Sequence, residues 1–132
     1  MSAEPQLEVE VLGPSRVPLE EIERLLALAL ASAGIDSGHV AIEFVSAERI
    51  TELNAEHRGI AAATDVLSFP IDGAKPSPGP MELGDIVICP QHTEDLREAI
   101  VHGALHLTGM DHEADDGEML AVQREIMAWV TP

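Results

Sequence analysis

The sequence predicts a single α+β domain spanning residues 1–132, with a mixed sheet of about four strands and helices packed on its faces. Three observations predict this fold. A chain of 132 residues suits one compact domain with one core. Apolar residues make up 45% of the chain, enough to build that core. Strand-like and helix-like apolar spacings follow one another in the order β-α-β-α-β-β-α-α, without an internal repeat.

The first strand and helix are marked by apolar spacing and by turn residues. Apolar and polar residues alternate from Leu7 to Val11, which predicts a strand with one buried face. Pro18 suits the first turn of a helix, and Gly34 is its natural stop. Alternation from Val40 to Phe44 then predicts a second strand.

The middle of the chain predicts a helix, an edge strand and a loop. Ser46 is a good N-cap for a helix that Gly59 should end, which leaves Arg58 at the exposed C-terminal end. Residues 65–70 predict a short strand that belongs at a sheet edge, because it ends in proline. Residues 71–82 are rich in proline and glycine and predict an irregular loop.

The last part of the chain predicts a buried strand and two helices. The apolar run from Gly84 to Cys89 predicts the strand. Thr93, with acidic residues directly after it, predicts the start of a central helix that runs to about Thr108. Asp115 and Glu118 have the spacing of a capping box. They precede an amphipathic terminal helix whose apolar-stripe positions are Met119, Val122, Gln123, Ile126, Met127 and Val130.

Composition excludes several functions. The formal net charge of −17 excludes a loose, nonspecific grip on a polyanion, and no DNA partner is expected. Aromatic residues are only 2% of the chain, so a ladder of base-stacking side chains is absent. No apolar run is long enough to span a membrane, and the N-terminus lacks the pattern of a secretory signal. A single cysteine allows no internal disulfide, which fits a cytoplasmic location.

Three histidines near the end of the central helix predict a metal site. His102 and His106 are four residues apart, so their side chains emerge from the same face of the helix. Gly109 can stop the helix and let the chain turn, which brings His112 back toward the pair. Three imidazoles suit one Zn²⁺ ion per chain and leave a coordination position open, as in catalytic zinc sites. Gly103 is small and lies beside them, which predicts space for a ligand to approach.

The same spacing occurs in metzincin metallopeptidases. There a glutamate follows the first histidine and acts as the base, whereas this chain has Gly103. The absence of this glutamate disfavours peptide hydrolysis, although a metal-bound water can be reactive without that base.

The residues around the histidines resemble a known family. The run from His102 to His112, HGALHLTGMDH, looks like the signature of the YbeY family, bacterial zinc-dependent endoribonucleases of rRNA maturation. Two further blocks agree with it and stand in the right order: Leu53-Asn54, Arg58-Gly59 and Thr64 to Pro70, then Leu83 to Ile88. The resemblance covers the chain from about residue 40 to its end.

The resemblance implies a function and a site. It implies a single-strand-specific endoribonuclease that trims ribosomal RNA precursors, notably at the small-subunit 3′ end, and takes part in ribosome quality control. It implies His102, His106 and His112 as metal ligands, and it matches Arg58 to the family's functionally important arginine. A guanidinium across the cleft from the metal would hold a phosphate and stabilise charge in the transition state. Asn54, one helical turn earlier, is a candidate for orienting the substrate, with a helix-cap or core-edge role as the alternative.

Two other functions remain open from the sequence. One is a zinc peptidase or esterase that takes its base from outside the helix. The other is a noncatalytic ribosome assembly factor, which the charge of −17 would suit because it repels RNA. Exposed charges are screened beyond about 8 to 10 Å at physiological salt, so zinc and Arg58 can still form a local positive site. We therefore expect weak RNA binding that ribosomal particles or assembly factors assist.

Overall fold

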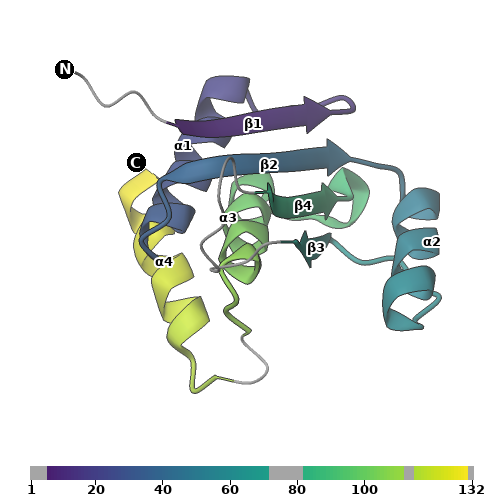
Figure 1. Cartoon of the computed structure of the whole chain (residues 1–132). Coiled ribbons are helices and arrows are strands. Elements are labelled where there is room, and N and C mark those ends of the chain that lie inside the picture. The colour runs from purple at the N-terminus through teal and green to yellow at the C-terminus, as the bar shows by residue number, and fades with distance from the viewer. Residues whose placement is uncertain (1–5, 72–81, 112–114, 131–132) are drawn as a thin grey trace.

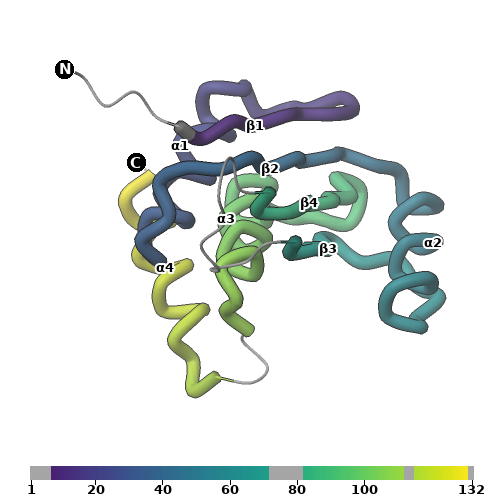
Figure 2. Tube along the Cα trace, viewed as in Figure 1, coloured from purple at the N-terminus to yellow at the C-terminus, as the bar shows by residue number. Residues whose placement is uncertain are grey.

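The computed structural model describes residues 6–71, 82–111 and 115–130. Its strands form one sheet in the order β1-β2-β4-β3, with bounds β1 Gln6–Leu12, β2 Ser37–Phe44, β3 Val66–Pro70 and β4 Glu82–Ile88. β1, β2 and β4 run parallel, and β3 runs antiparallel to β4. Figure 2 shows β1 and β3 at the two edges of this sheet. The predicted α+β fold with a four-stranded mixed sheet is confirmed.

Four α-helices complete the fold, together with a short 3₁₀ helix, η1. Their bounds are α1 Leu19–Ala31, α2 Ala47–Arg58, η1 Pro90–His92, α3 Leu96–Leu107 and α4 Glu118–Val130. α1, α3 and α4 pack against one another, and α3 also packs on β3 and β4. α2 stands apart from them at the right of Figure 1. Across the described parts of the chain, we find no helix with both the length and the hydropathy that crossing a bilayer requires.

The central strand β4 is buried on both faces. Ile86 and Ile88 belong to the main core under α1, α3 and α4, whereas Val87 belongs to a second apolar cluster with Leu67 of β3 and Ile50 of α2. The two sets separate because successive side chains of a strand point to opposite faces. The sheet therefore lies between α3 on one face and α2 on the other.

The predicted ends of α2 are confirmed. Ser46 is the N-cap, and its Oγ accepts a hydrogen bond from the backbone N–H of Arg49 at 3.1 Å. Gly59 ends the helix in the left-handed conformation, with φ of 72°, which a residue without a Cβ adopts readily. Arg58 is consequently the last helical residue, and its side chain is exposed.

The edge position predicted from Pro70 is also correct. β3 lies at the edge of the sheet and pairs with β4 alone among the described strands. Of the loop predicted at residues 71–82, residues 72–81 lie outside the described residues.

The predicted start of the third helix at Thr93 is wrong by two residues. Asp95 is the N-cap, and its carboxylate accepts hydrogen bonds from the backbone N–H groups of Arg97 and Glu98. Thr93 instead follows η1, and its hydroxyl donates to the carbonyl of Cys89 at 2.7 Å. Threonine and aspartate both cap helices well, so the pattern alone did not decide between them.

The predicted capping box at the start of α4 has a different geometry. The helix begins at Glu118, and the Asp115 carboxylate accepts from the N–H groups of Gly117 and Met119. The Glu118 carboxylate accepts from the N–H of Asp116 at 2.7 Å, not from that of Asp115. The two acidic side chains therefore bind neighbouring amides at this helix start without forming the reciprocal pair.

Candidate active site

Two of the three predicted metal ligands lie together on α3. His102 and His106 are one helical turn apart and half-buried. Their ring centroids are 4.8 Å apart, and the ring planes meet at 75° in an edge-to-face arrangement. The helical spacing thus brings the two imidazoles side by side, as predicted.

Both rings are oriented by oxygen atoms from other segments. His102 Nδ1 lies 2.7 Å from Oε1 of Gln123 on α4, and His106 Nδ1 lies 3.0 Å from the carbonyl oxygen of Met110. A carbonyl oxygen accepts hydrogen bonds, so each neutral ring carries its proton on Nδ1 and its lone pair on Nε2. Metal-binding histidines in proteins commonly have this arrangement.

The third predicted ligand, His112, lies outside the described residues. Among the residues that are described, no three histidine, cysteine, aspartate or glutamate side chains come together in a way that could hold a metal ion. The histidine pair on α3 is therefore the described portion of the predicted zinc site, and the full ligand set stays a prediction.

The histidines open onto a cleft of about 590 Å³. One wall is the edge strand β3 with the residues just before it, and the end of α2 contributes His57 and Arg58. Asp111 and the two α3 histidines also line it. The cleft lies within the size range of ligand sites in proteins. The structure thus brings Arg58 into the same cleft as His102 and His106, although they are far apart in the sequence.

Gly103 has a different role from the one predicted. It is buried, and a Cβ added there would lie 2.7 Å from Cγ2 of Ile86 and 3.2 Å from Oγ of Ser68. The Ser68 hydroxyl also donates to the Gly103 carbonyl at 3.0 Å. Gly103 therefore lets α3 approach the sheet closely, and the space for a ligand comes from the open side of β3 and the end of α2.

Asn54 is buried next to the cleft and does not line it. Its side chain is 3% exposed, and its Nδ2 donates to the carbonyl of Ala62 at 2.9 Å. Its Oδ1 is buried and accepts no hydrogen bond from the described residues. Asn54 therefore fixes the segment that follows Arg58. A direct role in binding substrate stays a prediction.

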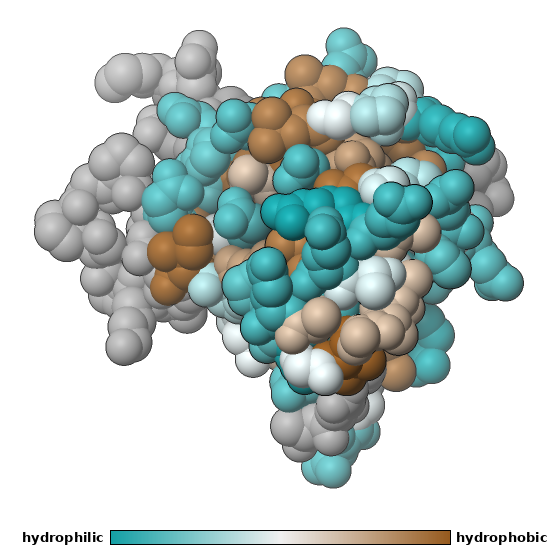
Figure 3. All heavy atoms as spheres, turned by 90° about the vertical axis from the view of Figure 1, so that its right-hand side faces the viewer, coloured by the Kyte–Doolittle hydropathy of each residue, from teal (hydrophilic) through white to brown (hydrophobic). Residues whose placement is uncertain are grey.

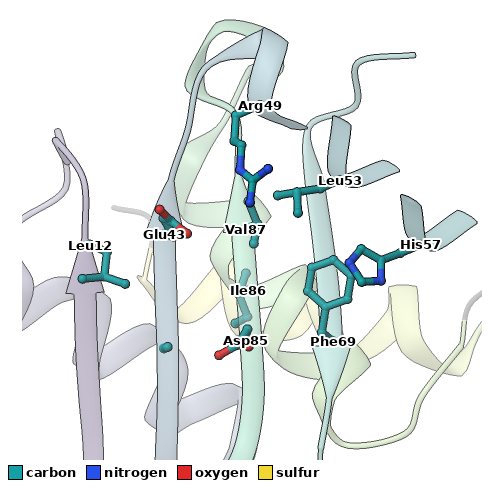
Figure 4. Close-up of a pocket in the computed structure, with 10 residues that line it drawn as sticks. Leu12, Glu43, Arg49, Leu53, His57, Phe69, Asp85, Ile86 and Val87 are labelled. Carbon is teal, nitrogen blue, oxygen red and sulfur yellow. The ribbon is translucent and has the colours of Figure 1, made fainter. Parts of the chain in front are cut away.

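A second hollow adjoins the cleft on the face of the sheet that α2 partly covers. It has a volume of about 540 Å³, and His57 and Phe69 line both hollows. Figure 4 shows Leu53, Val87, Glu43 and Asp85 around it. Figure 3, which views the molecule from the right-hand side of Figure 1, where α2 lies, shows a mostly hydrophilic surface with separate apolar patches.

A comparison with known families identifies the family of this chain. Residues 14–131 match the model of the family described as Endoribonuclease YbeY. This match spans well over half of the chain. The chain belongs to the YbeY family.

Individual relatives of the YbeY family extend the comparison. The Endoribonuclease YbeY of Rubrobacter xylanophilus is 41% identical and aligns over 89% of this chain and 89% of its own length. That of Symbiobacterium thermophilum is 39% identical over 83% of this chain and 86% of its own length. The solution structure of TM1509 from Thermotoga maritima is similar with a TM-score of 0.56 and 29% identity, over 89% of this chain and 85% of that one. Membership of the YbeY family and the predicted enzyme class, endoribonuclease, are confirmed.

Sequence reasoning missed two residues of the candidate site. Gln123 was identified only as part of the apolar stripe of α4, yet it is 8% exposed and binds His102. A glutamine within a buried stripe is a signal for such a role, because buried amides need hydrogen-bond partners. His57 was not singled out, although it precedes Arg58 directly and lines the cleft.

Proposed function

We propose that this chain is a zinc-dependent, single-strand-specific endoribonuclease that acts in rRNA processing at the small-subunit 3′ end and in ribosome quality control. Membership of the endoribonuclease YbeY family supports cleavage of RNA. The observation that carries the proposal is the convergence of Arg58 with His102 and His106 in one cleft.

One Zn²⁺ ion is proposed to bind His102, His106 and His112. The Nδ1 contacts to Gln123 and Met110 support this assignment, because they direct the Nε2 lone pair of each ring to a ligand. Zinc, when bound, would supply Lewis-acid chemistry at the phosphodiester.

Arg58 is proposed to bind the scissile phosphate. Its guanidinium offers a planar pair of donors that fits phosphate oxygens and stabilises the charge that develops on them. Gly59 ends α2 directly after Arg58, and Asn54 holds the following segment through Ala62. These contacts keep Arg58 at the mouth of the cleft.

The proposed substrate is a single-stranded ribosomal RNA precursor in the cytoplasm. The net charge of −17 repels RNA as a whole, so the local positive site needs help from ribosomal particles or assembly factors. Cleavage of free RNA is accordingly expected to be weak and sensitive to salt, because ions screen both this repulsion and the attraction to the local positive site.

The packing at Gly103 means that a peptidase would have to take its base from outside α3. A glutamate at this position, where metallopeptidases carry their base, would clash with Ile86 and Ser68. An RNA cleavage assay distinguishes the proposed endoribonuclease from a noncatalytic ribosome assembly factor, because the assembly factor would cut no RNA.

The test combines metal analysis with cleavage of single-stranded RNA. The wild-type protein should contain about one zinc ion per chain and cleave the RNA, and His106→Ala should lose both together. Wild-type protein that cleaves fully after zinc has been removed by a chelator would contradict the proposal.

Arg58→Ala should retain zinc and lower kcat about 10²- to 10³-fold, the usual effect of removing one transition-state donor. Arg58→Lys should recover little, because lysine lacks the planar fork. Arg124→Ala, which removes an exposed arginine of α4, is the matched control for the change in charge. Unchanged cleavage by Arg58→Ala would remove Arg58 from the scheme.

A further inference from the structure

Two aromatic rings stand at the boundary between the cleft and the second hollow. The His57 ring, from the last turn of α2, and the Phe69 ring, from β3, have centroids 4.7 Å apart and planes inclined by 55°. Both residues line both hollows. Figure 4 shows the two rings next to each other, reaching from separate elements.

This ring pair lies at the edge of the second apolar cluster, against which Phe69 packs. The His57 side chain is exposed and Phe69 is half-buried, whereas Phe44, elsewhere in the sheet, is only 4% exposed. A partly exposed aromatic pair at the edge of a cleft offers a flat, polarisable surface to a ligand, and nucleobases stack well on such surfaces.

Charged residues lie on both sides of the pair, with Asp65 and Asp111 on the side of the histidine cleft. Arg58 follows His57 directly and lies on the side of the histidine cleft. On the other side, the hollow has apolar walls from Leu53 and Val87 and is also lined by the guanidinium of Arg49 and the carboxylates of Glu43 and Asp85. Apolar walls suit a base. His57 directly precedes Arg58 and both line the histidine cleft, so a phosphate held by Arg58 would place a neighbouring base next to the ring pair.

We infer that His57 and Phe69 form a stacking platform for one unpaired nucleobase, next to the phosphate that Arg58 is proposed to bind. The inference rests on the proposed function and deepens it, because it names a source of selectivity for single strands. A base in a duplex is already stacked on its neighbours, whereas an unpaired base can be splayed out onto an aromatic side chain.

The test measures binding and cleavage of a short fluorescent single-stranded RNA. Stacking of one base is worth ~1–3 kcal/mol, so His57→Ala should raise Kd and KM about 5- to 140-fold and change kcat little. His57→Tyr keeps an aromatic ring and should restore binding. His57→Leu keeps apolar bulk without a π face and should not.

RNAs with a single abasic residue locate the stacked base. At one position, the missing base should weaken binding to the wild-type protein and have little further effect on His57→Ala, because both changes remove the same contact. His92→Ala, at an exposed histidine of η1 outside both hollows, is the matched control. Thermal unfolding of each variant checks that the fold is retained.

The outcomes separate this inference from the proposed function. If RNA is cleaved and His57→Leu binds as tightly as wild type, or if every abasic RNA weakens wild type and His57→Ala equally, the platform is wrong and the proposed function stands. If no RNA is cleaved but Kd depends on an aromatic residue at position 57, the platform stands and the proposed function is wrong. A wild-type protein that neither binds nor cleaves single-stranded RNA would overturn both.

Discussion

The two imidazoles on α3 are held by atoms that the helix itself does not supply. Gln123 comes from α4, and the Met110 carbonyl comes from the segment after α3. The His-x-x-x-His spacing predicts that the rings are neighbours, because helical geometry is local. It does not predict the oxygen acceptors, because Gln123 reaches His102 only after α4 packs on α3.

Gln123→Met should weaken zinc binding at the proposed site. The substitution keeps the length of the side chain and removes the oxygen that accepts from His102 Nδ1, and loss of such a contact lowers metal affinity about 10- to 100-fold. Competition with a calibrated zinc chelator measures the effect.

Gln91→Met is the control for that experiment, because Gln91 is exposed in η1, away from the histidines. Equal zinc affinities of Gln123→Met and wild-type protein would show that the contact to His102 does not support the metal.

The ends of a helix are predictable where one local signal marks them. They are not predictable where two cap residues compete, and neither is any feature that depends on packing between distant segments. Ser46 and Gly59 fixed both ends of α2. The start of α3 was misplaced, because Thr93 and Asp95 are both good caps and only the fold assigns the Thr93 hydroxyl to Cys89. The order of strands in the sheet and the burial of Asn54 depend on long-range packing, which local patterns do not contain.

Asp95→Ala should destabilise the protein by about 0.5–2 kcal/mol, the usual effect of removing a helix N-cap. The reason is that the N–H groups of Arg97 and Glu98 lose their acceptor. Urea unfolding measures the change. Glu94→Ala, one residue earlier and also acidic, is the control and should change stability by less than about 0.5 kcal/mol. The opposite order of the two effects would contradict the observed helix start.

His39 links three strands by charge. Its Nδ1 lies 3.0 Å from Oε2 of Glu82 in β4, and its Nε2 lies 3.6 Å from Oε1 of Glu10 in β1. The hydrogen bond with Glu82 is the main cause that raises the pKa of His39 above its ordinary 6.5, and the charges of Glu82, Glu10 and Glu8 add to it. The protonated imidazolium therefore stabilises the folded state.

This linkage predicts a pH dependence. The pKa of His39 is higher in the folded state than in the unfolded state. The stabilisation by its charge is therefore complete below about pH 6.5 and is lost as the pH rises through the pKa of the folded state. The difference in unfolding free energy between wild type and His39→Gln should thus shrink on the way to alkaline pH. It should not exceed about 1 kcal/mol, since the pair is partly exposed.

Urea unfolding across this pH range provides the measurement, with His92→Gln as the control for replacing an exposed histidine by glutamine. A wild-type advantage that grows with pH would have the wrong sign for this explanation.

The molecule as a whole is strongly negative, because it has 24 acidic residues and seven basic ones. Repulsion among like charges destabilises the compact state, and dissolved salt screens it. The sequence predicts this property completely, because it depends on composition. The location of the cleft, in contrast, depends on how α2, β3 and α3 meet across the sheet.

Added salt should therefore raise the thermal midpoint of unfolding. Each kcal/mol of relieved repulsion corresponds to about 3 to 6 °C for a domain of this size. Differential scanning calorimetry in low and high NaCl measures the shift. KCl at equal ionic strength should act equally, because screening does not depend on the identity of the monovalent ion. A midpoint that falls as NaCl is added would show that repulsion among the acidic side chains does not limit the stability of the fold.

The contact at Gly103 also determines the dimensions of the cleft. Because this residue has no side chain, α3 rests directly on Ile86 and Ser68, and the helix that carries both histidines is set at a fixed separation from the edge strand opposite them. A methyl group added here would lie 2.7 Å from Cγ2 of Ile86, so either that side chain or the helix would have to shift. The absence of a Cβ at Gly103 thus sets how closely α3 packs on the sheet, and with it the width of the cleft between the histidines and β3.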